Sequence, residues 1–215
     1  MTIEPSSRVI VGISGASGAR YACRVIERIT AVDLHVHLTV STLGRRLLAD
    51  ELGMNRIDAE ALSSGRGRLV TVHNNADLGA PIASGSFLHR GMVIVPASSN
   101  TLGAVASGIS DNLLQRAAAV ALKERRPLVI AHRESPLNHI DILNMQRCSR
   151  AGAIICPLNP GFYLHPQSID DLVDFMTGKI LDLLAVPHDL HTRWEERETQ
   201  ERRNAETHKQ RDEEI

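Results

Sequence analysis

The chain has 215 residues, of which 43% are hydrophobic and 23% are charged, and its formal net charge is −1. This length and composition are sufficient for one α/β domain with a sizeable core. The near-neutral balance excludes a basic footprint for nucleic acid or for a membrane surface. Because no apolar run has membrane-spanning length and residues 1–8 lack a signal-peptide pattern, the sequence predicts a cytoplasmic protein.

The cysteines Cys23, Cys148 and Cys156 form an odd, widely spaced set without a C-x-x-C motif. This pattern argues against a disulfide framework and against a thiolate metal site, and it fits a reducing compartment. The ten histidines are scattered along the chain and form no clear metal-ligand motif. We therefore expect a protein that uses no metal.

Residues 9–19 combine an apolar run with three glycines spaced three residues apart, which predicts a strand, a tight turn and then a helix over 19–30. The start of that helix directs backbone N–H groups into the turn, and Ser14 and Ser17 add hydroxyl donors. The turn could therefore bind a phosphate-sized anion. Its spacing matches neither a P-loop nor a dinucleotide fingerprint, and a tight turn that binds nothing is an equal alternative at this point.

A second strand over 34–40 ends at Ser41, and a helix follows through Glu51. Right-handed crossover geometry makes the two strands parallel neighbours. Residues 53–90 lose this regularity apart from one short strand over 69–72. We interpret this long section as a candidate mobile cover over a site.

Regular structure returns with a strand over 92–96, apolar throughout and typical of burial on both faces. Small polar residues follow, and Asn100 or Thr101 is predicted to cap a helix that begins near Leu102. A second helix is predicted to begin at Ser110 or Asp111 and to end before Pro127.

The last third of the chain predicts strands over 128–131 and 153–156, with a helix up to about Ala151 between them. A capping box at Ser168 predicts the start of a helix that ends near Leu184. Beyond Trp194 the chain is almost entirely charged or amide-bearing. We therefore divide it into one domain over 1–194 and a charged tail over 195–215, solvated or disordered.

Polar residues follow the end of every long predicted strand. Ligands bind outside the carboxyl ends of strands in open parallel sheets, so these residues are expected to line one crevice. Its neutral donors, guanidinium, carboxylate and phenol suit a flexible phosphorylated cofactor held without metal. The residues are Ser14, Ser17, Ser41, Ser98 to Thr101, Arg133, Glu134 and Tyr163.

Several segments together resemble the UbiX-type flavin prenyltransferases, over about residues 8–194. They are the glycine turn 12–19, the segment 95–102, the segment 122–129, the pair Arg133-Glu134 and the segments 160–163 and 166–173. The resemblance implies a flavodoxin-like, Rossmann-like α/β three-layer sandwich with a mostly parallel sheet. It also implies a homo-oligomer, typically a dodecamer. The implied reaction joins a dimethylallyl group from dimethylallyl monophosphate to N5 and C6 of reduced FMN, and the prenylated FMN serves a UbiD-type decarboxylase.

The resemblance also implies roles for individual residues. Glu51 and Glu134 match the acids of the proton transfers, and Lys123, Tyr163 and Lys179 match the prenyl-phosphate contacts, with Arg116 nearby. The implied FMN contacts are Gly15, Ala16, Ser17, Ser41, Ser98, Ser99, Asn100, Thr101 and Arg133.

Some positions depart from the family pattern. Ala97 replaces a common cysteine, His132 replaces a common proline, and Lys179 replaces a frequent arginine, which changes a bidentate phosphate contact into a point charge. The segment 96–101 also resembles flavin-dependent cysteine decarboxylases. A decarboxylase of a cysteine-containing substrate and a non-catalytic flavin carrier are therefore the alternative functions.

Overall fold

The computed structural model describes residues 7–190 and 192. The predicted tail over 195–215 lies outside these residues, and the domain limits stay a prediction. Among the described residues, no helix is both long and apolar enough to cross a membrane.

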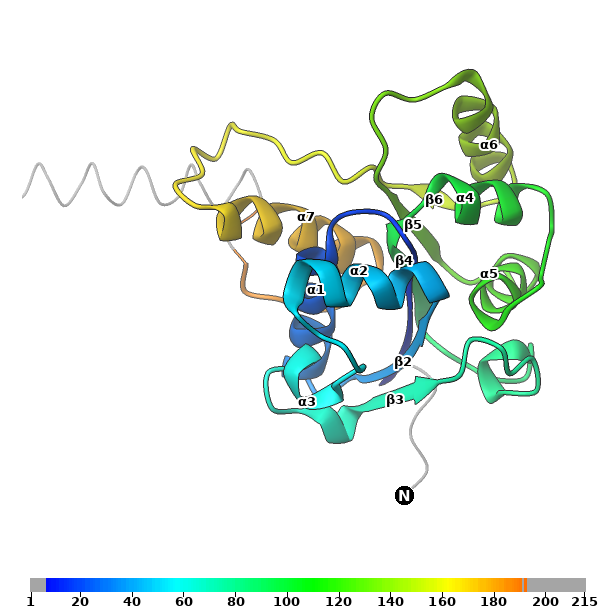
Figure 1. The fold of residues 1–215 in the computed structure, drawn as a ribbon, viewed down its shortest axis with the longest axis horizontal. Helices are drawn as coiled ribbons and strands as arrows, with labels where there is room; N and C mark the ends of the chain where they lie inside the picture. The colour runs from blue at the N-terminus through cyan, green and yellow to red at the C-terminus, as the bar shows by residue number, and fades with distance from the viewer. Residues whose placement is uncertain (1–6, 191, 193–215) are drawn as a thin grey trace, which may run out of the picture.

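One sheet forms the centre of the molecule, and all of its strands are parallel (Figure 1). Its spatial order is β3-β2-β1-β4-β5-β6, which confirms the predicted parallel α/β architecture. The strands are β1 (Arg8–Ile13), β2 (His35–Val40), β3 (Val70–His73), β4 (Gly91–Ala97), β5 (Leu128–His132) and β6 (Ile154–Ile155).

The helices cover both faces of this sheet and divide the buried side chains into two apolar clusters. Figure 1 shows α1 beside α7 on one side, with α4, α5 and α6 on the other. The three-layer sandwich is therefore confirmed. The helices are α1 (Ala19–Ala31), α2 (Thr42–Leu52), α3 (Ala59–Leu62), α4 (Ser99–Ala106), α5 (Leu113–Lys123), α6 (His139–Arg150) and α7 (Ile169–Leu183), with short 3-10 turns at Gly67–Leu69 and Pro81–Ala83.

Strand composition explains the position of each strand in the sheet. All seven residues of β4 are buried, as expected for an apolar strand in the middle of a sheet covered on both faces. On β2, Val36, Leu38 and Val40 pack into the cluster beneath α1, while His37 and Thr39 point to the opposite face. The alternation of apolar and polar side chains on β2 therefore reflects two different buried environments.

The strand order reverses direction between β1 and β4. The chain continues from β1 towards β2 on one side and from β4 towards β5 on the other, which leaves a crevice at the carboxyl ends of β1 and β4. The crevice is the place where the sheet topology favours ligand binding.

The section 53–90 is more ordered than its sequence indicates. It contains α3 and the edge strand β3, which pairs with β2 along its whole length. Strand β3 confirms the short strand predicted over 69–72, as expected for the β-branched residues Val70, Thr71 and Val72, and it joins this part of the section to the sheet.

Two helix starts differ from prediction. Helix α4 begins at Ser99, because the Ser98 side chain, rather than that of Asn100 or Thr101, accepts from the backbone N–H of Thr101. Helix α5 is capped by Asn112. In contrast, the capping box at Ser168 is present as predicted at the start of α7.

Candidate functional site

Ser14 connects the two strands that flank the crevice. Its buried hydroxyl donates to the carbonyl of Pro96 at 3.0 Å and accepts from the backbone N–H of Ser98 at 2.8 Å. The backbone N–H of Ser14 also donates to Pro96 at 3.1 Å. The end of β1 is therefore fixed against the turn that begins α4.

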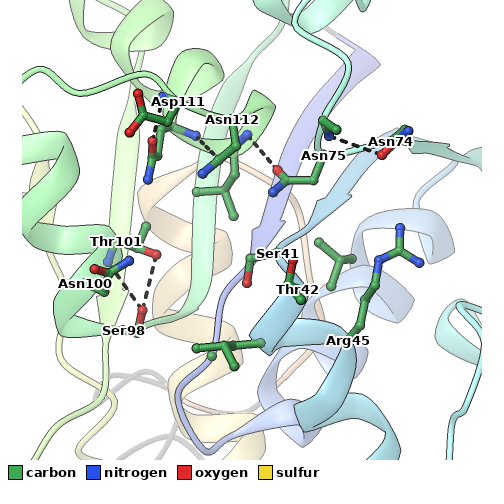
Figure 2. Close-up of a pocket in the computed structure, with 16 residues that line it drawn as sticks. Ser41, Thr42, Arg45, Asn74, Asn75, Ser98, Asn100, Thr101, Asp111 and Asn112 are labelled. Atoms are coloured by element: carbon green, nitrogen blue, oxygen red, sulfur yellow. Dashed lines mark hydrogen bonds between the residues drawn. The ribbon is translucent and has the colours of Figure 1, made fainter.

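A pocket of about 410 Å³ opens beside this junction (Figure 2). It brings together five of the predicted cofactor contacts, which are Gly15, Ser41, Ser98, Asn100 and Thr101. Its remaining lining residues are Val40, Thr42, Leu43, Arg45, Asn74, Asn75, Ala76, Asp111, Asn112, Leu114 and Gln115.

Three helices begin at this pocket, and each has a polar N-cap residue in its wall. The Ser41 hydroxyl accepts from Gly44 at 3.0 Å, and the Asn112 side chain accepts from Gln115 at 3.1 Å. Ser98 caps α4. Because the positive ends of three helix dipoles converge on the pocket, it favours an anion such as a phosphate.

Close packing between α2 and β1 forms one side of the pocket. A Cβ atom on Gly44 would lie 2.6 Å from the carbonyl oxygen of Ile13, so only glycine fits there. The backbone N–H of Ser41 also donates to that carbonyl at 2.9 Å. The start of α2 is thereby held against the end of β1.

Three residues of the pocket wall are absent from the sequence prediction of the site. Arg45, Asn75 and Asn112 line it although none belongs to the family motifs. The adjacent asparagines 74 and 75 have a loop-forming signal in the sequence, but their place in the wall depends on the pairing of β3 with β2.

The glycine turn differs from the anion site predicted for it. The Glu51 carboxylate accepts from the backbone N–H of Ala19 at 2.8 Å and from that of Gly18 at 3.1 Å. Gly18 has φ = 128°, a conformation that favours glycine. The start of α1 is therefore satisfied by the protein's own carboxylate, and the helix starts available to a ligand are those of α2, α4 and α5.

Arg133 and Glu134 follow β5 and lie beside the glycine turn. The Arg133 guanidinium donates to the Ser17 carbonyl at 3.2 Å and lies 4.0 Å from the Glu134 carboxylate. His132, the last residue of β5, contacts the hydroxyl of Ser99, which follows the neighbouring strand β4, at 3.2 Å. The structure therefore brings Ser17, Ser99, Arg133 and Glu134 together at the carboxyl ends of β1, β4 and β5. Ala16 is buried in the same glycine turn.

Tyr163 and Lys179 lie together in a different pocket, of about 500 Å³, between β6 and α7. The Tyr163 ring packs edge-on against Phe175, with ring centroids 5.4 Å apart. Neither residue lines the pocket beside Ser98. Within one chain, Tyr163 therefore does not line the same crevice as Ser98, in contrast to the prediction.

Lys123 and Arg116 also lie away from the first pocket. Helix α5 begins at that pocket, and Lys123 is at its far end, about 15 Å along the helix axis. Lys123 pairs with Glu124 beside Gly85, and the Arg116 guanidinium donates to the Ala83 carbonyl at 3.1 Å. These two predicted phosphate contacts therefore flank the segment 83–87.

Polar side-chain pairs connect the neighbouring strands β2 and β3. His35 contacts Thr71 at 2.8 Å, and His37 contacts His73 at 3.0 Å. Burial lowers the pKa of His37 to about 3, with the neighbouring histidines and Arg8 adding to the effect. Among the described residues, no group of three histidine, cysteine or acidic side chains could hold a metal.

Residues 2–181 match the model of the flavoprotein family. The flavin prenyltransferase UbiX of Halalkalibacterium halodurans is 46% identical over 198 residues, covering 89% of this chain and 96% of that protein. A crystal structure of AnUbiX with FMN and dimethylallyl pyrophosphate superposes with a TM-score of 0.80 at 38% identity, covering 88% of this chain and 97% of that one. A dodecameric FMN-dependent UbiX-like decarboxylase from Escherichia coli O157:H7 gives a TM-score of 0.79 at 36% identity, covering 87% of this chain and 98% of that one. The chain belongs to the flavoprotein family and, within it, to the UbiX-type flavin prenyltransferases.

Proposed function

We propose that this protein transfers a dimethylallyl group from dimethylallyl monophosphate to N5 and C6 of reduced FMN. The observation that carries the proposal is the pocket at the reversal of strand order, where the starts of α2, α4 and α5 converge. The family relationship supplies the reaction.

The pocket beside Ser98 suits FMN. The Ser41, Ser98 and Thr101 hydroxyls and the Asn100 amide can contact a phosphate and a ribityl chain. Gly15 lies in the same wall, where a Cβ atom would collide with the Cβ atom of Leu43. Further FMN contacts, along the carboxyl ends of the central strands, are proposed for Ala16, Ser17, Ser99 and Arg133. When bound, reduced FMN supplies the electron-rich nucleophile.

The remaining residues have roles at the prenyl donor. Lys123, Lys179 and the Tyr163 hydroxyl stabilise the phosphate that leaves when the allylic C–O bond breaks. Arg116 adds positive charge near Lys123. The carboxylates Glu134 and Glu51 exchange the protons of the reaction.

A second copy of the chain is needed to bring these groups together. In one chain, α5 separates Lys123 from the FMN pocket, and Tyr163 and Lys179 lie in a pocket of their own. Large apolar side chains are exposed, with Ile140 68% and Phe162 70% accessible, as expected for surfaces that meet another subunit. We infer a homo-oligomer, a dodecamer like the Escherichia coli relative, in which neighbouring chains complete each site.

The proposal extends to the use of the product and to the compartment of the protein. Prenylated FMN is a cofactor for another enzyme, which we infer to be a UbiD-type decarboxylase. The three cysteines are unpaired, as expected for the reducing cytoplasm.

The test is anaerobic incubation of the protein with FMN, a reductant and dimethylallyl monophosphate, followed by mass spectrometry of the recovered flavin. We expect a flavin that is heavier by one prenyl unit. Unchanged flavin mass with folded, FMN-binding protein would contradict the proposal.

Two further measurements separate the alternatives. A flavin carrier would bind FMN without changing its mass, and the Glu134→Gln variant would behave like the wild type. A cysteine decarboxylase would release carbon dioxide from a cysteine-containing peptide. Apart from the segment 96–101, no observation on this chain favours either alternative over the prenyltransferase.

A further inference from the structure

Asn75 occupies a position in the FMN pocket that no family motif includes. It follows β3 at the edge of the sheet and reaches towards the start of α5 (Figure 2). Its side-chain oxygen accepts from the Thr39 hydroxyl at 3.0 Å and from the backbone N–H of Leu114 at 3.0 Å. Its carbonyl oxygen accepts from Leu113 at 2.8 Å.

These contacts determine the orientation of the Asn75 amide. A backbone N–H can only donate, so the side-chain atom that faces Leu114 must be the oxygen. The amide nitrogen is therefore the atom turned away from α5. Figure 2 shows this nitrogen on the side of Ser41, and the nitrogen has no hydrogen-bond partner among residues 7–190 and 192.

The surroundings of that nitrogen favour an anion. Ser41 and Asn112 begin the helices on either side of it. The exposed Arg45 guanidinium lines the same wall and has no ion-pair partner in the part of the chain that the structure describes. Two helix starts, the Arg45 guanidinium and the fixed Asn75 N–H₂ group thus belong to the wall of one pocket, in which Asp111 is the only acidic residue among the described lining residues.

We propose that Asn75 is a phosphate-binding residue, which donates its amide N–H to the phosphate of FMN while its oxygen positions the start of α5. The proposal rests on the proposed function, because it assigns the phosphate end of the cofactor within the same pocket. Thr39, which is fully buried, acts as a positioning residue that holds the Asn75 amide in this orientation.

The decisive measurement compares FMN with riboflavin, which lacks the phosphate, in fluorescence titrations of the full-length protein. The Asn75→Asp variant keeps an oxygen for Thr39 and Leu114 but replaces the donor with a negative charge. We expect FMN to bind at least about tenfold more weakly and riboflavin to bind as in the wild type. Asn75→Ala removes the donor without adding charge, and we expect it to weaken the binding of FMN more than that of riboflavin. Thermal melting verifies that both variants fold.

A matched pair of threonine variants tests the positioning role. Thr39→Val removes the hydrogen bond to Asn75 and should weaken FMN binding severalfold. Thr71→Val removes the equivalent cross-strand bond to His35, away from the pocket, and should leave FMN binding unchanged.

The outcome also separates this inference from the proposed function. If the wild type binds FMN but both Asn75 variants keep its ratio of FMN to riboflavin affinity, the assignment of Asn75 is wrong and the function stands. An equal loss of affinity for both ligands would also overturn the assignment, because removal of a contact to the phosphate cannot weaken the binding of riboflavin. Wild-type protein that binds no FMN would contradict the proposed function itself.

Discussion

The Glu51 carboxylate lies 2.8 Å from the backbone N–H of Ala19 and provides the negative charge at the start of α1. The contact joins α2, where Glu51 lies, to the turn that follows β1. It explains why a glycine-rich turn with the features of an anion site needs no external anion. The same carboxylate is a proposed proton carrier, so its contribution to stability can be measured separately from its contribution to catalysis.

Glu51→Gln should lower the free energy of unfolding by about 0.3–1 kcal/mol, because it removes a charge that complements the α1 dipole. Urea denaturation measures this change. Asp50→Asn is the matched control, since Asp50 pairs with Arg46 on the same helix and does not contact α1. A Glu51→Gln variant as stable as the wild type would show that the α1 contact contributes nothing.

Ser14→Ala should destabilise the protein by about 1–3 kcal/mol, since it removes a buried hydroxyl and deprives the half-buried backbone N–H of Ser98 of its acceptor. Denaturant unfolding is again the measurement. Ser107→Ala, on the exposed end of α4, should change stability by less than about 0.5 kcal/mol. A Ser14 variant as stable as this control would contradict the role of the junction.

The buried histidines predict a loss of stability in acid. The pKa of His37 is lowered to about 3 and that of His89 to about 4, both mainly by burial. The unfolded chain, whose histidines titrate near 6.5, therefore binds more protons below that pH. Stability is complete above about pH 6.5 and decreases as the pH falls towards 3.

Urea unfolding between pH 8 and pH 4 tests this dependence. His37→Gln should make the decrease shallower, by at most about 1.4 kcal/mol per pH unit. The groups that face His37 are Arg8 on β1, His35 on β2, His73 on β3 and Phe87 with His89 after the 3-10 turn. A His37→Gln variant that keeps the wild-type dependence of stability on pH would refute the assignment.

Mixing two inactive variants tests whether neighbouring chains share a site. Lys123→Ala and Glu134→Gln chains, after subunit exchange, should recover up to about a quarter of wild-type activity, because random pairing completes that fraction of sites. Glu134→Gln mixed with Arg133→Ala should recover nothing, since both residues follow β5 of the same chain. Recovery in neither mixture would contradict shared sites, because it would mean that Lys123 and Glu134 of each site come from the same chain.

Local patterns were sufficient to predict most elements of the fold. The apolar runs at β1, β4 and β5 specify buried parallel strands, and the capping box at Ser168 specifies the start of α7. These features depend on residues close together in the sequence.

The site required contacts between distant residues. Asn75 enters the pocket wall because β3 pairs with β2, and Glu51 reaches α1 across 32 residues of sequence. The direction of α5, which carries Lys123 away from the pocket, depends on the crossover between β4 and β5. No local pattern reports such relationships, so the motifs identified the chemistry but not the grouping of its residues.

The sheet ends on two short strands, four residues of β3 at one edge and two residues of β6 at the other. An edge of that length offers few unpaired N–H and C=O groups to another chain. Copies of the protein are therefore poor templates for adding strands to one another. We expect association through side chains on the helical faces, such as Ile140 on α6, so that the sheet cannot grow into an aggregate.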